Sequence, residues 1–239
     1  MNIKLKIELD NSILDIKYRS SIVSFFKKSV QEYDENIYNN FYDKTLNKSK
    51  SYTFSIILAN PKFNKEEVKV ENNIMYIYFS TWKYEDLLIF YNSFLGQLNK
   101  KFSIYRNSFT LKEITFLRTN EIFSKDIIVK FLSPVIVRSH DKENNKDWYV
   151  GYDEDDFQEK LKQNISNSIL NNNLIIDTTD FEIIPIKPKK VVVKLYNKNV
   201  QANAGIYQIK GNLELLNFLM LSGIGSQRNS GFGYFKIIG

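Results

Sequence analysis

The sequence predicts an α+β fold in which two successive halves each follow a β-α-β-β-α-β order, and three patterns support this. Polar and apolar residues alternate along residues 2–9, as in a strand with one buried face. Apolar residues recur at helical spacing along residues 84–98. The chain closes with a compact apolar helix at 213–221, a glycine-rich stretch and a short strand. This order is that of a ferredoxin-like unit, so we expect two tandem ferredoxin-like (RRM-like) domains, 1–108 and 109–239.

The first half supplies the elements of this order in turn. The strand at 2–9 precedes a single helix from 20 to about 42 and a second strand at 51–59. Residues 67–80 predict a hairpin that turns at Asn72 and Asn73, because asparagines between two β-prone runs are typical of tight turns. The helix at 84–98 and a strand at 101–106 complete the unit. The apolar face of that helix is broad and consists of Leu87, Leu88, Phe90, Tyr91, Phe94, Leu95 and Leu98.

The second half follows the same plan less regularly. The expected elements are strands at 109–118 and 126–137, a polar loop at 140–147, a strand at 148–151, a helix at 153–170, strands near 181–196 and 204–210, and the helix at 213–221. The glycine-rich stretch then leads into the last strand. We expect the boundary between the two domains near residues 106–112.

Composition is compatible with a polyanionic partner without requiring one. The 239 residues include 33 Lys and Arg against 27 Asp and Glu, which gives a net charge of +6. Such an excess attracts nucleic acid if the cations share a face. With 43% hydrophobic residues, the chain can bury a substantial core. Most of the 18 Phe and 15 Tyr belong there, although exposed tyrosines on a sheet are suited to stacking bases.

Several residue patterns are absent. The sequence has no cysteine, so it has no disulfide framework and no thiolate zinc site, and one histidine does not build a multi-histidine metal centre. We therefore expect no metal and no cofactor. No apolar run approaches the roughly 20 residues of a membrane span, and residues 1–10 alternate like a strand rather than forming a signal core. These features predict a cytoplasmic protein without membrane segments.

The last seventeen residues hold the most informative pattern, in which four glycines and Arg228 stand between a helix and a strand. Glycine permits positive φ and a close backbone approach, so consecutive N–H groups can converge on phosphate oxygens. Nucleotide-binding fingerprints instead place glycines after a strand and before a helix, and this chain lacks Gly-Lys-Ser/Thr after its glycines. Two interpretations stay open, an anion-binding loop and a turn that only leads into the final strand.

The arrangement resembles a known family. A helix, Gly-x-Gly, five residues, Gly-Phe-Gly and a terminal strand are similar to the glycine-rich loop of the CRISPR-associated endoribonucleases that cut precursor CRISPR RNA within its repeats, the sixth Cas family of the RAMP superfamily. The match comprises Gly223, Gly225, Gly231, Phe232 and Gly233. Segments 52–57, 131–137 and 205–211 fall where that family has counterparts, so the resemblance covers nearly the whole chain. It too implies tandem ferredoxin-like domains.

The resemblance also implies a reaction. Members of the family cut RNA without metal, because the 2′-hydroxyl beside the scissile phosphate attacks in line and leaves a 2′,3′-cyclic phosphate and a 5′-hydroxyl. Many relatives place a histidine between the first helix and the second strand, and here that position falls on or near Tyr42. A catalytic lysine in some relatives matches Lys50, with Lys48 as the neighbour that substitutes for it. Where some relatives carry a helix tyrosine, this chain has Lys27 or Phe26.

Each of these residues also has a plain structural interpretation. Tyr42 is either a proton donor or orienting group, or a packing residue at a helix end, because a phenol with an ordinary pKa of about 10 is a poor base near neutrality. Lys50 is either a catalytic cation or a solvated loop lysine. His140 has an ordinary pKa suited to proton transfer, but it lies in what reads as an exposed hairpin tip, about a hundred residues from the family position. We expect it to be a solvated loop residue.

The predicted RNA contacts lie in two segments. Arg228 and the backbone of Gly223–Gly233 are expected to hold RNA phosphates, with Lys236 extending that surface if it points outward. Lys187, Lys189 and Lys190 bracket Pro188 and form either an extended basic arm for an RNA backbone or lysines that protect a sheet edge from pairing.

The combined prediction is a metal-independent CRISPR repeat-RNA endoribonuclease. The first alternative is a non-catalytic RNA-binding subunit that keeps the glycine loop but lacks the histidine base, and the second is another RAMP-type backbone subunit of an RNA-guided complex. The expected partners are precursor CRISPR repeat RNA and an RNA-guided interference complex, for a protein acting as a monomer or a homodimer.

Overall fold

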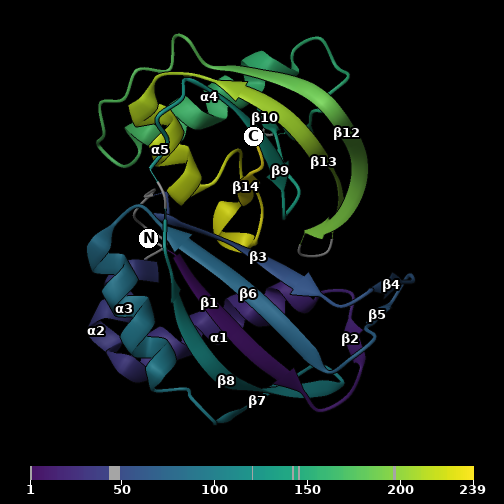
Figure 1. Cartoon of the computed structure of the whole chain (residues 1–239). Coiled ribbons are helices and arrows are strands. Elements are labelled where there is room, and N and C mark those ends of the chain that lie inside the picture. The colour runs from purple at the N-terminus through teal and green to yellow at the C-terminus, as the bar shows by residue number, and fades with distance from the viewer. Residues whose placement is uncertain (1, 43–48, 120, 142, 145, 196–197) are drawn as a thin grey trace. The chain divides into compact units, whose positions relative to one another are not determined.

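The computed structural model describes residues 2–42, 49–119, 121–141, 143–144, 146–195 and 198–239 (Figure 1). The chain divides into two compact units. Met1–Asn47 and Ser55–Thr119 form the first unit, and Lys48–Phe54 and Asn120–Gly239 form the second. The segment Lys48–Phe54, which includes the start of the strand Tyr52–Leu58, thus belongs to the second unit. The residues on either side of it in the sequence belong to the first unit.

The first unit is built on a five-stranded sheet in the order β3-β6-β1-β8-β7. Its strands are β1 (Asn2–Leu9), β3 (Tyr52–Leu58), β6 (Ile74–Thr81), β7 (Lys101–Ile104) and β8 (Asn107–Leu117). The strand expected at 2–9 is confirmed, and it pairs antiparallel with β6 on one side and β8 on the other. Alternate residues of β1 are buried, which is the pattern of a sheet packed on one face.

Aromatic rings join this sheet to the helices of the first unit. The helices are α1 (Tyr18–Tyr33), α2 (Glu35–Tyr42) and α3 (Tyr84–Leu95). Phe79 of β6 contacts Phe26 of α1 at 5.8 Å and Phe90 of α3 at 4.7 Å between ring centroids. All three rings are fully buried, so both helices pack against the same face of β6.

The single helix expected from 20 to about 42 is wrong, because the chain breaks at Asp34. This residue is extended, with φ −160° and ψ 119°, and separates α1 from α2. Its Oδ1 accepts a hydrogen bond from the amide of Ile37 at 2.9 Å. An aspartate in that position satisfies one of the amides that a new helix leaves without a partner, so it favours a second helix start.

The hairpin expected at 67–80 is also wrong. Its first arm, β5 (Glu67–Lys69), joins a separate sheet with β2 (Ile13–Asp15) and β4 (Lys62–Phe63). The second arm, β6, pairs with β1 instead. The amide of Val70 donates to the carbonyl of Ser12 at 2.9 Å, so the segment after β5 follows the N-terminal chain rather than folding back on β6.

The strand expected to begin the second half belongs to the first sheet. It is β8, and it pairs with β1 along most of its length, so the first unit extends to Thr119. The expected strand at 101–106 is β7, which forms a hairpin with β8 at the edge of the same sheet. Sequence alternation predicts that a segment is a strand, but the partner strand depends on long-range pairing.

The second unit repeats the topology of the first. Its sheet has the order β12-β13-β9-β14, from β9 (Asp126–Phe131), β12 (Glu182–Leu195), β13 (Lys198–Lys210) and β14 (Phe235–Ile237). Its helices are α4 (Phe157–Leu170) and α5 (Leu213–Ser222). Four strands of the first sheet lie in the order β3-β6-β1-β8, and the four of the second lie in the order β12-β13-β9-β14. When each set of four is numbered along the chain, both sheets have the order second, third, first, fourth. The fold therefore consists of two ferredoxin-like units, as predicted.

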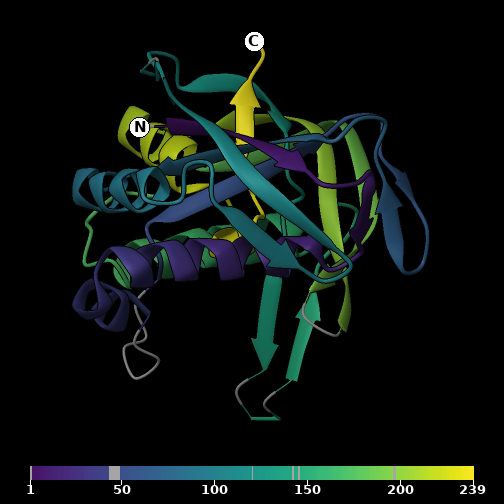
Figure 2. The ribbon, with the colours of Figure 1, turned by 90° about the horizontal axis from the view of Figure 1, so that it is seen from below.

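Two strands of the second unit differ from expectation. The strand at 126–137 ends at Phe131 because Pro134 follows, although Val135 and Ile136 make single bridges to Asn203 and Ser226. The polar loop at 140–147 and the strand at 148–151 are instead a hairpin, β10 (Arg138–Asp141) with β11 (Lys146–Tyr149), the teal and green arrows at the bottom of Figure 2.

Candidate functional site

The glycine-rich segment begins where α5 ends. Gly223 terminates the helix with φ 78°, and Gly225, Gly231 and Gly233 also have positive φ, between 74° and 86°. Between them lies a short 3₁₀ turn, η1 (Arg228–Ser230). A residue with a Cβ is strained at such φ values, so the expectation that these glycines are needed for backbone conformation is confirmed.

The space that a side chain would need at these glycines is filled by the second unit itself. A Cβ on Gly225 would lie 2.6 Å from the carbonyl oxygen of Ile136, and one on Gly231 would lie 2.7 Å from the ring of Phe54. A Cβ on Gly223 would meet Thr53, and one on Gly233 would overlap the carbonyl of Ile224. Close packing of the loop on its own unit therefore explains the four glycines without a ligand.

Most of the loop amides are also engaged internally. The amides of Ile224, Ser226 and Gly233 donate to the carbonyls of Gly233, Ile136 and Pro134 at 2.8–3.0 Å. In the described part of the chain, the amides of Gln227 and Asn229 have no hydrogen-bond partner, and both residues are partly exposed. Of the amides that were predicted to converge on a phosphate, those of the turn at 227–229 are therefore the ones left to bind an anion.

Phe232 differs from the expected RNA contact. Its side chain is 1% exposed and packs in an apolar cluster with Ile136, Val193, Leu195, Val200 and Ala202. It is a core residue of the second unit.

Arg228 also points inward rather than toward solvent. Its guanidinium donates to the carbonyl of Ser222 at 3.1 Å, to Ser49 Oγ at 2.9 Å and to Ser168 Oγ. Burial lowers the pKa of Arg228 to about 10, so the group remains a cation near neutral pH. No carboxylate in the described ranges forms an ion pair with it. Arg228 is therefore a buried cation held by neutral oxygens, which differs from the expected direct contact with a phosphate.

Hydrogen bonds to Arg228 and Phe232 hold the segment that carries Lys50. Ser49 accepts from Arg228, and Thr53 Oγ1 donates to the carbonyl of Phe232 at 2.8 Å. Lys50 is partly buried and lies between these two attachment points. Ser49, Thr53 and Ser168 were not predicted from the sequence, because serine and threonine carry no pattern that identifies a distant partner.

Tyr42 lies at the end of α2 in the first unit. The Nζ of Lys27 is 5.3 Å from the centroid of its ring, and the rings of Tyr38 and Phe41 are 5.2 Å and 5.1 Å away. The structure thus brings Tyr42 together with Lys27, which is, with Phe26, one of the two residues that the resemblance places where some relatives carry a helix tyrosine. Lys48 lies outside the described residues.

The lysines of β12 lie on an edge strand and are exposed. Lys190 Nζ pairs with Asp153 Oδ1 at 2.6 Å, and this hydrogen bond raises the pKa of Lys190. Lys187 and Lys189 form no ion pair with any described residue. Two of the three predicted cations, Lys187 and Lys189, are therefore available to a polyanion.

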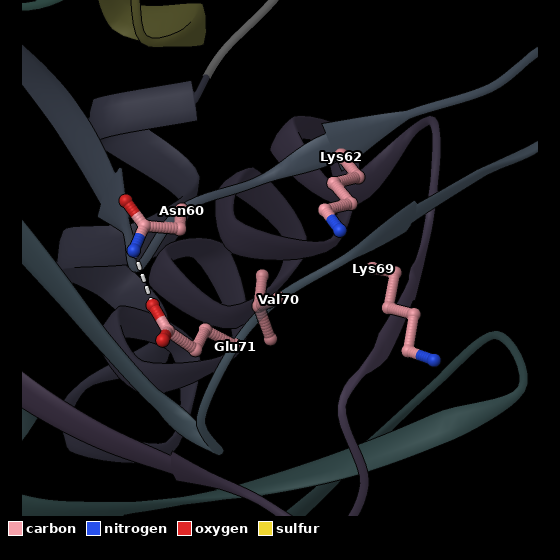
Figure 3. A pocket seen from close by; sticks show the side chains of 5 residues that line it. All are labelled: Asn60, Lys62, Lys69, Val70 and Glu71. Carbon is pink, nitrogen blue, oxygen red and sulfur yellow. Dashed lines mark hydrogen bonds between the residues drawn. The ribbon is translucent and has the colours of Figure 1, made fainter.

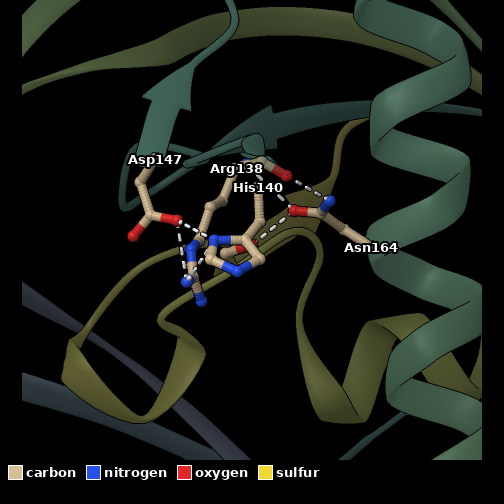
Figure 4. Close-up of polar contacts among 5 residues, drawn as sticks. Arg138, His140, Asp147 and Asn164 are labelled. Carbon is tan, nitrogen blue, oxygen red and sulfur yellow. Dashed lines mark hydrogen bonds and ion pairs between the residues drawn. The ribbon is translucent and has the colours of Figure 1, made fainter. Parts of the chain in front are cut away.

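His140 belongs to a cross-strand cluster on the β10–β11 hairpin (Figure 4). Its Nδ1 lies 2.7 Å from Asp147 Oδ1, which also pairs with Arg138 Nη2 at 2.8 Å. Burial raises the pKa of Asp147, but the hydrogen bonds and charges of Arg138 and His140 outweigh it, so that pKa lies below its ordinary value. Asn164 of α4 fixes the base of the hairpin by bonding both the amide and the carbonyl of Arg138. The cluster stabilises the hairpin as a cross-strand pair does.

A surface pocket of about 480 Å³ lies beside β4 and β5 in the first unit (Figure 3). Asn60, Lys62, Lys69, Val70 and Glu71 line it, and Asn60 Nδ2 donates to Glu71 Oε2. The pocket is positively charged but holds no pair of groups suited to acid and base catalysis. The described residues contain no cluster of three or more His, Asp or Glu that could hold a metal, and none of the helices traced is long and apolar enough to cross a membrane.

Comparisons with solved structures identify the fold. The chain is similar over its full length to "Characterization of a Cas6-related gene from Pyrococcus furiosus", at 22% identity and TM-score 0.87, covering 98% of that chain. It is similar over its full length to "An RAMP protein binding different RNA substrates", at 22% identity and TM-score 0.85, covering all of that chain. A Cas6 product complex matches with TM-score 0.73 at 10% identity, with both chains fully covered.

Comparisons of sequence give the family. No curated protein matches the chain. The model of the family described as "CRISPR associated protein Cas6, C-terminal" matches residues 117–237, which is just over half of the chain and includes the whole glycine-rich segment. The chain therefore belongs to the Cas6 family of CRISPR-associated proteins.

Proposed function

We propose that this chain is a CRISPR repeat-RNA endoribonuclease that cuts precursor CRISPR RNA without a metal ion. Membership of the Cas6 family supports a role in binding or processing CRISPR RNA. In the proposed reaction, the 2′-oxygen beside the scissile phosphate loses its proton and bonds to phosphorus. The bond from phosphorus to the 5′-oxygen breaks, and that oxygen takes up a proton. The products are a 2′,3′-cyclic phosphate and a 5′-hydroxyl.

The observation that carries this proposal is the attachment of the Lys50 segment to the glycine-rich loop. Arg228 bonds Ser49 on one side of Lys50, and the carbonyl of Phe232 accepts from Thr53 on the other. Because both ends are held, the backbone of Lys50 has a defined place in the second unit. Negative charge accumulates on the phosphorane oxygens during in-line attack, and a cation held in place beforehand stabilises it without reorganisation.

We assign Lys50 to the stabilisation of that charge, with Lys48 as its neighbour. We assign Tyr42 to orienting the 2′-hydroxyl or to donating a proton to the 5′-oxygen, because an ordinary phenol does not accept protons readily near neutrality.

RNA binding is proposed to depend on the charge beneath the loop rather than on a direct contact with Arg228. A buried cation without a carboxylate partner produces a positive potential that water screens poorly. The partly exposed turn at Gln227 and Asn229 lies in that potential and presents two amides that no described residue engages. Lys187 and Lys189 on the edge strand β12 add exposed positive charge for the RNA backbone.

A non-catalytic RNA-binding subunit is the second candidate, and one observation favours it. The single imidazole of the chain, His140, is paired with Asp147 in a hairpin of the second unit. The resemblance places the family's histidine position on or near Tyr42, which is not a histidine. A protein described as "An RAMP protein binding different RNA substrates" is among the similar structures. Product analysis separates the two candidates.

The test is incubation of the protein with repeat RNA from its own host in EDTA, followed by analysis of fragment ends. We expect cleavage at one fixed site that leaves a 2′,3′-cyclic phosphate and a 5′-hydroxyl. A matched RNA with 2′-deoxyribose at the scissile nucleotide should bind equally and remain uncut, because the attacking oxygen is missing. A strict requirement for a divalent ion, or products with a 3′-hydroxyl, would contradict the proposed chemistry. Tight binding without cleavage would establish the non-catalytic alternative.

A further inference from the structure

We propose that this chain forms a homodimer through an exposed apolar side of α3, with the α3 helices of the two copies packed antiparallel. We call this surface, formed by Tyr84, Leu88, Tyr91 and Leu95 of α3 and by Phe116 of β8, the α3 stripe. The proposal goes beyond RNA cleavage, because it concerns how two copies of the protein bind each other.

Helix α3 is apolar on two adjacent sides. Its inner side packs in the core of the first unit, where Leu87 and Phe90 are at most 2% exposed. The side that carries the α3 stripe lies next to it, and there Tyr84 is 55%, Leu88 41% and Leu95 44% exposed. A helix that packs on one sheet needs one apolar side, so the fold of the unit does not explain the second.

The residues of the α3 stripe recur with the spacing of a seam between two helices. Tyr84, Leu88, Tyr91 and Leu95 follow one another at steps of four, three and four residues. This is the a and d spacing with which two helices pack side by side. At 3.6 residues per turn, the four positions lie within about 60° of the helix surface and form one line. Leu98, three residues further on, is 36% exposed and continues the line past the end of the helix.

Phe116 widens the α3 stripe onto the neighbouring strand. Its side chain is 53% exposed, and its ring centroid lies 4.5 Å from that of Tyr91, where α3 runs beside β8 (Figure 1). The stripe presents on the order of 400 Å² of apolar surface, which is the size of patches that commonly serve binding. Two such patches with their polar rims bury on the order of 1,000 Å² in total, which is enough for a weak but specific dimer.

The charges at the two ends of the α3 stripe favour a second copy in antiparallel orientation. Glu85 in the first turn of α3 and Lys100 beyond its last turn are both exposed. Neither forms an ion pair with a residue that the structure describes. An antiparallel pair brings Glu85 of each copy to the Lys100 end of the other, twice by symmetry. A parallel pair would bring like charges together.

The same arrangement sets the register of the two helices. When Leu88 of one copy lies opposite Leu95 of the second copy, the twofold axis passes next to Tyr91. Apolar side chains then face apolar side chains along the whole seam, as in an isologous interface. The α3 stripe therefore supplies both the apolar spacing and the reversed charges that its own occupant needs.

The first test measures self-association of the protein by sedimentation equilibrium. We expect a reversible dimer with a Kd on the order of 10 µM, as suits an interface of this size. Leu88→Lys and Leu95→Glu should each weaken self-association about tenfold or more, because each places a charge against a leucine. Tyr105→Glu is the matched control, since Tyr105 is 61% exposed in the same unit but outside the α3 stripe, and it should leave the dimer unchanged.

A mixture of the two weakened variants tests the register. In the mixed dimer, the Leu88→Lys and Leu95→Glu side chains meet as opposite charges, and the second contact remains leucine against leucine. We expect the mixture to dimerise although each variant alone does not. Circular dichroism and the melting temperature of each variant should match those of the parent, because the substituted side chains are exposed.

An introduced thiol gives an independent readout, because the sequence has no cysteine. Tyr91→Cys lies next to the proposed twofold axis, so two copies should bring their thiols close enough for a disulfide. Under mild oxidation we expect this variant to form a covalent dimer on a non-reducing gel. Tyr105→Cys introduces the same thiol away from the α3 stripe and should stay monomeric on that gel.

Three outcomes would overturn the homodimer. The first is a parent protein that remains monomeric at about 100 µM, about ten times the expected Kd, including one that binds only a different protein through α3. The second is folded Leu88→Lys and Leu95→Glu variants that dimerise as well as the parent. The third is a mixture of these variants that stays monomeric together with a Tyr91→Cys variant that does not crosslink.

Discussion

Lys50 owes its position to the residues on either side of it. Ser49 and Thr53 bond Arg228 and Phe232, and these contacts place an otherwise ordinary loop lysine in the second unit. The sequence identifies Lys50 only through its likeness to family members. The two attachments supply a physical reason for the role that we propose for it, because a cation stabilises a transition state best when it is already in place.

We predict that Lys50→Ala slows single-turnover cleavage about tenfold or more with little loss of RNA affinity, because the lost interaction acts mainly on the transition state. Lys62→Ala, which removes an exposed lysine of the first unit, is the matched control and should leave the rate unchanged. His140→Ala should also change the rate little. A rate that is insensitive to Lys50→Ala and abolished by His140→Ala would show that catalysis occurs at the hairpin cluster instead.

Tyr42→His tests whether Tyr42 stands where relatives carry their base. We expect faster cleavage near neutral pH and a new dependence of the rate on an ionisation near the imidazole pKa of about 6.5. Cleavage should rise with pH through that value, because the neutral imidazole is the form that accepts a proton. Tyr38→His, one turn earlier on α2, is the control and should have neither effect. Unchanged kinetics for both variants would argue against a catalytic place for Tyr42.

At the scale of elements, the main structural role of the glycine-rich segment is to let its backbone pack closely against the rest of the second unit. Its glycines bring the backbone against Thr53, Phe54, Ile136 and Ile224, and most of its amides bond the same unit. Part of the expectation of an anion cradle is thereby replaced by a structural role. The loop also holds the segment before β3 that carries Lys50, the residue that we propose stabilises the transition state.

We predict that Gly225→Ala destabilises the protein by about 3 kcal/mol or more, from strain at φ 82° and from overlap with the carbonyl of Ile136. Gly211→Ala introduces the same methyl group in the same unit, where the nearest atom is 3.4 Å away and φ is not positive, and should be nearly neutral. Chemical denaturation measures both. Equal stabilities for the two variants would mean that the loop relaxes easily and is not held by close packing.

At the scale of the whole molecule, the chain uses one topology twice. Both units place their strands in the order second, third, first, fourth, yet the first carries the α3 stripe, and the second carries the glycine-rich loop and the hairpin. A net charge of +6 is consistent with a polyanionic ligand. The shared fold explains the repeated elements, and the differing surfaces carry the functional proposals.

The sequence by itself determined the order and type of most elements, because apolar periodicity and glycine placement are local signals. It therefore predicted the repeated ferredoxin-like plan, the helices at 84–98 and 213–221, and the need for positive φ in the loop. It did not predict the break at Asp34 within an otherwise continuous helical pattern, nor the pairing partners of Glu67–Lys69 and Asn107–Leu117. Strand pairing and helix capping compete with periodicity, and a single sequence does not show which prevails.

Only the tertiary structure decided what the candidate site residues face. Arg228 and Phe232 look like RNA contacts in the sequence, because a cation and an aromatic ring among glycines suit a phosphate and a base. In the fold, Arg228 is buried and donates hydrogen bonds to three serines. Phe232 is a core side chain. Tyr76 and Tyr78, which no motif distinguishes, project from the face of β6 opposite to the one that packs against α1 and α3. The reason is that the direction of a side chain depends on which face the helices cover, and that is settled by packing between segments far apart in the chain.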